Sequence, residues 1–261
     1  VYYRPFNFYE MWARRLWGLY RDYVAVTDAA TGSERMMCKY DQLDFADTPT
    51  LFDTHATDDY VHLVIVGFNR MGRALLLEAL RVCHYHGYDD RMETAKRHKT
   101  RITVVDRLID DMKQQFESQF PNIDTQIYDI DVEYLNLDIS SSAMRDNLRR
   151  WSAEPHCQLT VAVCVYEPDL GLSLGLSLPP EVYESETRVL IRQEKLNGLG
   201  KFIDVDAGGR FRNVRIFGMH ADAIASEALN DRLPAYIHYN YCANRNASGR
   251  DYISCLLYTS P

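Results

Sequence analysis

The chain has 261 residues, of which 46% are hydrophobic, and a formal net charge of −8. This length and apolar content suffice for one substantial core with flanking segments. The acidic balance argues against a nucleic-acid-binding surface, which needs a basic face to release counterions from phosphates. No apolar run approaches the roughly 18 residues that cross a bilayer, and no signal peptide is visible. We therefore expect a cytoplasmic protein, or the cytoplasmic side of a membrane protein.

The first 59 residues differ in kind from the rest of the chain. Residues 6–23 are rich in aromatic side chains and arginines and predict a helix, whereas residues 41–60 are acidic and rich in turn formers and predict a linker. One interpretation of the helix is packing on the domain or on a second subunit. The other is the cytoplasmic exit of an upstream transmembrane transport segment, because aromatic rings flanked by arginines suit a membrane interface.

Residues 61–81 predict a buried strand, a glycine turn and a helix in immediate succession. The strand is a β-branched run that ends at Gly67, and apolar residues recur at helical spacing after Gly72. Unpaired amides and the positive dipole end at such a helix start favour a phosphate, and the two glycines keep side chains away. The sequence therefore predicts a dinucleotide site at this turn.

The turn departs from the G-x-G-x-x-G pattern at one position. Asn69 stands where the second glycine allows the backbone to approach a diphosphate most closely. Asn is the non-glycine residue that best tolerates a positive φ, so we expect the turn to survive. Its side chain would then intrude on the ligand or form a hydrogen bond to it.

A second strand, residues 101–106, ends in Asp106. This carboxylate is expected to accept hydrogen bonds from the adenosine ribose and to repel a ribose 2′-phosphate, which favours NAD or NADH over NADP, with ATP or ADP as the alternative. The neighbouring Arg107 keeps NADP open. A helix cap or loop anchor is the other interpretation of Asp106. Because Asp106 lies 34 positions after Gly72, we interpret residues 84–100 as an insertion.

The remaining segments alternate between helical and strand periodicity. An α/β, Rossmann-like, doubly wound and mostly parallel sheet of about six strands follows from this order. The predicted helices are residues 108–120 and 144–151, and the later strands are residues 123–130, 159–166, 188–192 and 214–217. The carboxyl ends of the strands would bring Gly67, Asp106, Asp129 and Glu167 towards one crevice.

The turn from Val64 to Gly72, with Arg70 between Asn69 and Met71, resembles the G-x-G-R-x-G turn of TrkA-N or RCK (regulator of potassium conductance) domains. The likeness covers about residues 60–220 and implies a nucleotide-binding domain that regulates potassium transport, here as a homo-oligomer such as a homodimer. By this resemblance the pyrophosphate would be surrounded by Gly67, Phe68, Asn69, Arg70, Met71 and Gly72, the ribose by Asp106 and Arg107, and Asp129 would follow the third strand.

Residues 221–246, in the C-terminal segment 221–261, predict a helical pair broken at Pro234. This segment faintly resembles the start of a RyR-type repeat, which accompanies TrkA-N domains in some bacterial proteins. We expect it to be truncated, with non-native residues at its end. The predicted organisation is thus a helical segment and linker over 1–59, the nucleotide-binding domain over 60–220, and this C-terminal segment.

Catalytic and metal-binding signals are absent from the sequence. The six cysteines show no CxxC spacing, which fits reduced thiols, and the Cys83, His84, His86 and His98 group lacks tetrahedral ligand spacing. No Tyr-Lys pair four residues apart, Gly-x-Ser-x-Gly elbow or Walker A lysine occurs. We therefore predict a regulatory nucleotide-binding module with no catalytic residue. The alternatives are an NAD-dependent oxidoreductase with an unrecognised catalytic residue, and a dimerisation domain that has lost its ligand.

Overall fold

A computed structural model describes the chain in segments. They are residues 7–18, 22–27, 34–39, 60–83, 98–121, 123, 127, 129–185, 187–195 and 209–219. The predicted C-terminal helical pair, most of the acidic linker and most of the predicted insertion lie outside these residues.

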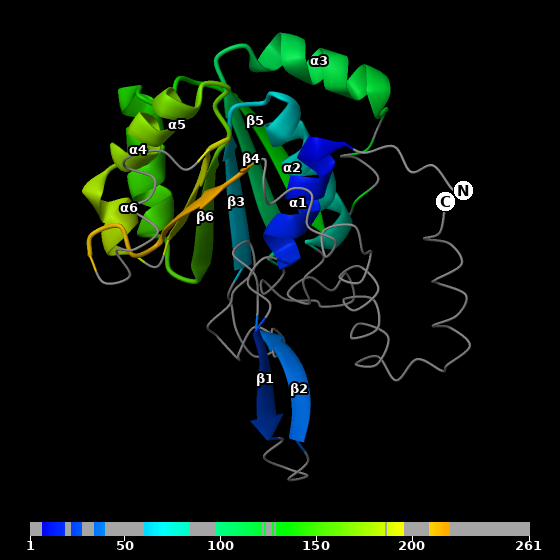
Figure 1. Ribbon diagram of the computed structural model, residues 1–261. Helices are drawn as coiled ribbons and strands as arrows, with labels where there is room; N and C mark the ends of the chain where they lie inside the picture. Colours follow the sequence, from blue (N-terminus) through cyan, green and yellow to red (C-terminus); the bar gives the residue numbers. More distant parts are fainter. Residues whose placement is uncertain are drawn as a thin grey trace.

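Six parallel strands form one sheet in the order β5-β4-β3-β6-β7-β8 (Figure 1). The strands are β3 (Tyr60–Val66), β4 (Thr100–Asp106), β5 (Ile130–Asn136), β6 (Cys157–Val163), β7 (Arg188–Arg192) and β8 (Val214–Phe217). The order runs outward from β3 in one direction and then restarts at β6, which is the doubly wound arrangement with its switch point between β3 and β6. The predicted α/β Rossmann-like fold is confirmed.

Helices cover both faces of this sheet (Figure 1). On one face lie α1 (Phe8–Gly18), α2 (Arg70–Val82) and α3 (Ile109–Gln119), and on the other α4 (Ser142–Ser152), α5 (Pro168–Leu176) and α6 (Pro180–Glu184). Alternate residues of β3 enter the two hydrophobic clusters: Leu63 and Ile65 face α2, and Val64 and Val66 face α4. Burial on both faces explains why this strand is apolar without interruption.

Helix α1 packs on the domain, as one of the two interpretations of the aromatic segment predicted. Trp12 is fully buried, its ring centroid lies 6.3 Å from that of Phe217, and its indole nitrogen donates to the Met219 carbonyl oxygen at 3.1 Å. The predicted helix was too long, because the chain forms a hairpin of β1 (Asp22–Thr27) and β2 (Glu34–Lys39) after Gly18. The β-branched and aromatic residues of β1 favour a strand over a helix.

The predicted third strand, residues 123–130, was also misplaced, since β5 spans Ile130–Asn136. This strand lies at the sheet edge, and exposed and partly buried residues alternate along it. Its charged residues Asp131 and Glu133 suit a strand edge, but they hide the apolar alternation that identifies a strand in a sequence. Among the described residues, no helix is both long and apolar enough to cross a bilayer.

Candidate nucleotide site

The turn between β3 and α2 requires glycine at two positions. Gly67 has a φ of +96°, and its amide donates to the Val105 carbonyl oxygen at 2.8 Å. A Cβ atom at Gly67 would lie 3.1 Å from the carbonyl carbon of Cys164. A Cβ atom at Gly72 would lie 2.1 Å from the Gly67 carbonyl oxygen. The two glycines therefore allow the helix start to pack directly against the end of the strand.

Asn69 caps the start of α2. Its φ is −76°, so the predicted use of its tolerance for positive φ was wrong. The side-chain oxygen accepts hydrogen bonds from the amides of Met71 at 2.9 Å and Gly72 at 3.3 Å, and the side-chain nitrogen donates to the Cys164 carbonyl oxygen. Asn is a favoured N-cap residue for this reason. The two amides expected to receive a phosphate are thus bonded within the chain.

Asp106 lies beside this turn, at the end of β4. One carboxylate oxygen accepts from the Phe68 amide at 2.8 Å and the other from the Leu108 amide at 2.9 Å. The loop-anchoring role, which was the alternative interpretation, is therefore present. An ionised carboxylate has about four acceptor sites, so two remain for further donors.

The other residues predicted around the pyrophosphate fall into two groups. The side chains of Phe68 and Met71 are fully buried, so only their backbone atoms face the turn. Phe68 packs edge-on against Phe116, with 5.3 Å between the ring centroids. Arg70, in contrast, is exposed on the first turn of α2.

Arg107 is the predicted second residue at the ribose. Its side chain is exposed, and its guanidinium lies 3.5 Å from the carboxylate of Asp138, which follows β5. The pKa of Asp138 is lowered by hydrogen bonds from the Ser140 hydroxyl and amide, with a smaller contribution from Arg107. Asp138 was not predicted, because the strand before it was misplaced.

Asp129 does not converge with the turn, so its predicted position is wrong. It precedes β5, at the amino edge of the sheet, where its carbonyl oxygen accepts from the Thr100 amide at 3.0 Å. Glu167 follows β6 and therefore lies at the same carboxyl edge as Gly67 and Asp106, as predicted. The error follows from the misplacement of β5, because a residue at a strand's start and one at its end lie on opposite edges.

Exposed apolar side chains flank the turn at this edge. Leu108, after β4, is 62% exposed, and Tyr166, after β6, is 75% exposed. Leu170, on the first turn of α5, is also exposed. Ligand sites combine apolar surface with a few polar groups, so these residues offer a face for a base or sugar beside Asp106. The position of Leu108 and Tyr166 two or three residues after a strand end was the sequence signal that had not been used.

Arg192 is buried at the end of β7. It donates to the carbonyl oxygens of Val165 at 3.4 Å and Tyr166 at 3.2 Å, and pairs with Glu194 at 2.7 Å. Its Nε atom has no hydrogen-bond partner among the described residues. The arginine therefore fixes the chain where β6 ends. The sequence signal for Arg192 was a charged residue at the end of an apolar strand.

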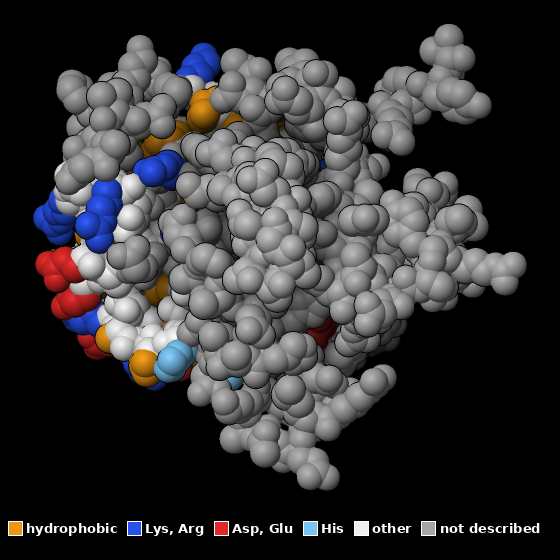
Figure 2. Space-filling view, turned by 90° about the horizontal axis from the view of Figure 1, so that it is seen from below, with side chains coloured by type: hydrophobic (Ala, Val, Ile, Leu, Met, Phe, Trp, Pro, Cys, Tyr) orange, Lys and Arg blue, Asp and Glu red, His pale blue; other side chains and the backbone are white. Residues whose placement is uncertain are grey.

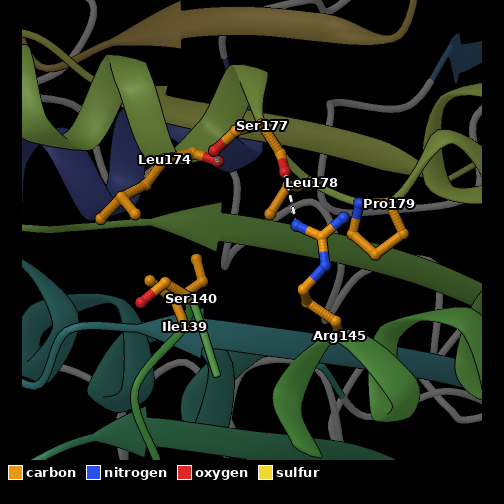
Figure 3. Close-up of a pocket in the computed structure, with 7 residues that line it drawn as sticks. All are labelled: Ile139, Ser140, Arg145, Leu174, Ser177, Leu178 and Pro179. Carbon is orange, nitrogen blue, oxygen red and sulfur yellow. Dashed lines mark hydrogen bonds between the residues drawn. The ribbon is translucent and has the colours of Figure 1, made fainter. Parts of the chain in front are cut away.

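Figure 3 shows a cavity between α4 and α5. Its volume is about 30 Å³. The side chain of Arg145 extends across it and donates to the Ser177 carbonyl oxygen at 3.0 Å. Such a volume holds only one or two water molecules. This cavity is therefore too small for a nucleotide. The described part of the chain contains no group of His, Cys, Asp and Glu residues that could hold a metal ion.

Acidic and basic side chains of the described residues lie next to one another on the surface (Figure 2). Arg149, for example, lies 2.9 Å from Asp146 and 3.3 Å from Glu181. Two neighbouring carboxylates thus compensate the charge of Arg149.

No protein-family model, curated protein or solved structure matches this chain. The TrkA-N resemblance therefore depends on the sequence of the β3–α2 turn and on Asp106. The fold that it implied is confirmed, whereas nucleotide binding, potassium transport and the RyR-type repeat stay predictions.

Proposed function

We propose that the chain is a regulatory module that binds an adenine nucleotide at the carboxyl edge of its sheet, between β3 and β6. The sequence nominates NAD(H), with ATP or ADP as the alternative. The observation that carries the proposal is the position of Asp106, which the Phe68 amide holds at 2.8 Å beside the β3–α2 turn with acceptor sites to spare. Open doubly wound sheets bind ligands at this switch point.

The regulatory part of the proposal is supported by contacts that lead away from this edge. Asn69 is bonded to the end of β6 at Cys164, and Arg192 holds the next two carbonyl oxygens of that segment. The guanidinium of Arg192 also lies 6.0 Å from the ring centroid of Tyr9 in α1. A ligand that moves the end of β6 would thereby change the packing of α1. Couplings of about 1–3 kcal/mol are typical of such linkage.

By the TrkA-N resemblance, the process under control is potassium or other ion transport, on the cytoplasmic side of a membrane, in a homo-oligomer. The ligand shifts an equilibrium between two arrangements by its difference in affinity for them. This mechanism needs no catalytic residue.

Two measurements test the binding. Mass spectrometry of small molecules released from the denatured protein would identify a co-purifying nucleotide, and calorimetry with NAD, NADH, ATP and ADP would measure the affinity. We expect Asp106→Asn to weaken binding by about 10- to 100-fold, since a hydrogen bond to a charged group contributes about 1.5–3 kcal/mol. Glu167→Gln removes the same charge from the same edge and should change the affinity little. Equal losses in both variants would contradict a specific role for Asp106.

The second candidate is a domain without a ligand, and the bonding of Asn69 to the start of α2 favours it. No heat of binding with any of the four nucleotides, and no released nucleotide, would decide for this candidate. An oxidoreductase would instead transfer hydride from NADH to carbonyl compounds, with loss of the activity in Asp106→Ala.

A further inference from the structure

The side chain of Asn69 bonds amides at the start of α2, where a dinucleotide-binding turn presents free amides to a diphosphate. Its oxygen accepts from the Met71 and Gly72 amides, which are two of the donors that a helix start leaves unpaired. Its nitrogen donates to the Cys164 carbonyl oxygen across the switch point. The amide group is therefore held on both sides, by the start of α2 and by the residue that follows β6.

Arg73, one turn after Asn69 on α2, points away from the start of the helix. Arg73 donates to the Gln115 side chain at 2.8 Å, and its guanidinium lies 5.5 Å from the Phe68 ring centroid. Gln115 lies on α3, and the Phe68 ring lies in the hydrophobic core. A diphosphate at the start of α2 would displace the Asn69 oxygen without gaining the charge of Arg73. Arg70, on the first turn of α2, is exposed, so solvent and salt screen its attraction for a phosphate.

The sugar-binding side of the crevice is arranged differently. Asp106 keeps acceptor sites, and the exposed Leu108 and Tyr166 side chains flank the turn. The hydroxyls of a ribose and the face of a base match these groups.

We propose that Asn69 is the specificity-determining residue of the adenine-nucleotide site, an inference that rests on the proposed function. Asn69 substitutes for the ligand's diphosphate on α2, so the chain binds its ligand through the adenosine and gains no affinity from a diphosphate. This narrows the proposed ligand class from NAD(H), ATP or ADP to an adenine nucleoside or nucleoside monophosphate.

The test is the ratio of the affinities for ADP and adenosine, measured by calorimetry on the full chain. In the unmodified chain we expect ADP to bind no more than about threefold more tightly than adenosine. In Asn69→Gly, which restores bare amides, the ratio should rise by about tenfold in favour of ADP, which corresponds to about 1.4 kcal/mol. Asn69→Asp keeps a cap on α2 but adds a negative charge, so the ratio should fall below that of the unmodified chain.

Because the glycine variant lacks a helix cap, Asn69→Ser provides a second variant that caps α2 with a shorter side chain. It should raise the ADP ratio less than Asn69→Gly. Tenfold tighter binding of ADP or NAD than of adenosine to the unmodified chain would overturn the inference while leaving nucleotide binding intact, as would equal ratios in all variants. Absence of binding by adenosine, AMP, ADP and NAD to every variant would refute the proposed function itself.

Discussion

A buried histidine in the central strand makes the stability of the domain depend on pH. His62 lies in β3 with no exposed surface, its Nε2 atom lies 2.8 Å from the Thr103 hydroxyl, and its ring meets that of Trp151 edge-on at 4.9 Å. Its Nδ1 atom has no hydrogen-bond partner within the described part of the chain. Burial, and secondarily the charge of Arg101, lower the pKa of His62 from 6.5 to about 3. Near neutral pH the imidazole is therefore uncharged in the folded state.

The sign of the effect is set by linkage. Below pH 6.5 the unfolded chain binds a proton at this residue, whereas the folded chain does not until the pH approaches 3. The stability contribution is thus complete above pH 6.5 and is lost as the pH falls through this window. At pH 5 the loss is about 2 kcal/mol relative to pH 7, from RT ln(1 + 10^1.5). The result depends little on the folded-state pKa, since about 3 is already well below 5.

Urea denaturation at pH 7 and pH 5 measures this loss. His62→Gln places an uncharged polar side chain in the strand, so the free energy of unfolding of the variant should fall by about 2 kcal/mol less than that of the unmodified chain between the two pH values. All other titrating groups contribute equally to both proteins and cancel. Equal declines for His62→Gln and the unmodified chain would refute the reasoning.

Three further predictions concern packing. Gly72→Ala should destabilise the fold by more than about 2 kcal/mol in urea denaturation. The clash of its Cβ with the Gly67 carbonyl oxygen outweighs the roughly 1 kcal/mol gain in helix propensity. In the control Gly171→Ala the Cβ would lie 3.7 Å from its nearest neighbour, so this variant should be neutral or mildly stabilising. Trp12→Ala should cost about 3–5 kcal/mol in the same assay, and a cost below about 1 kcal/mol would contradict the packing of α1. Burial raises the pKa of the Cys164 thiol to about 12, so iodoacetamide at pH 8 should alkylate it only in urea, as mass spectrometry would detect; alkylation of the folded protein would contradict its burial.

The sequence predicted those elements whose environment is uniform along their length. Strands β3 and β6 are buried on both faces, so their apolar runs and the glycine turn after β3 identified them. The two misassigned elements are β5 and β1, and packing determines the structure less strongly there. The edge strand β5 carries outward charges, and β1 follows α1 directly, where aromatic residues suit a helix and a strand alike. Asp129 was misassigned for the first of these reasons.

At the site, the sequence identified the important positions but not how one side chain is used. Asp106 could be placed beside the turn, because the ends of adjacent parallel strands share one edge. Asn69 carried two competing signals: it disrupts a glycine fingerprint, and it is a favoured N-cap residue. Only the structure shows that its nitrogen also donates to the carbonyl oxygen of Cys164, directly after β6, which no local pattern encodes. Because this bond joins both sides of the switch point, Asn69→Gly should both loosen the crevice and free the Met71 and Gly72 amides. The free energy of unfolding and the ratio of the ADP and adenosine affinities should therefore change together.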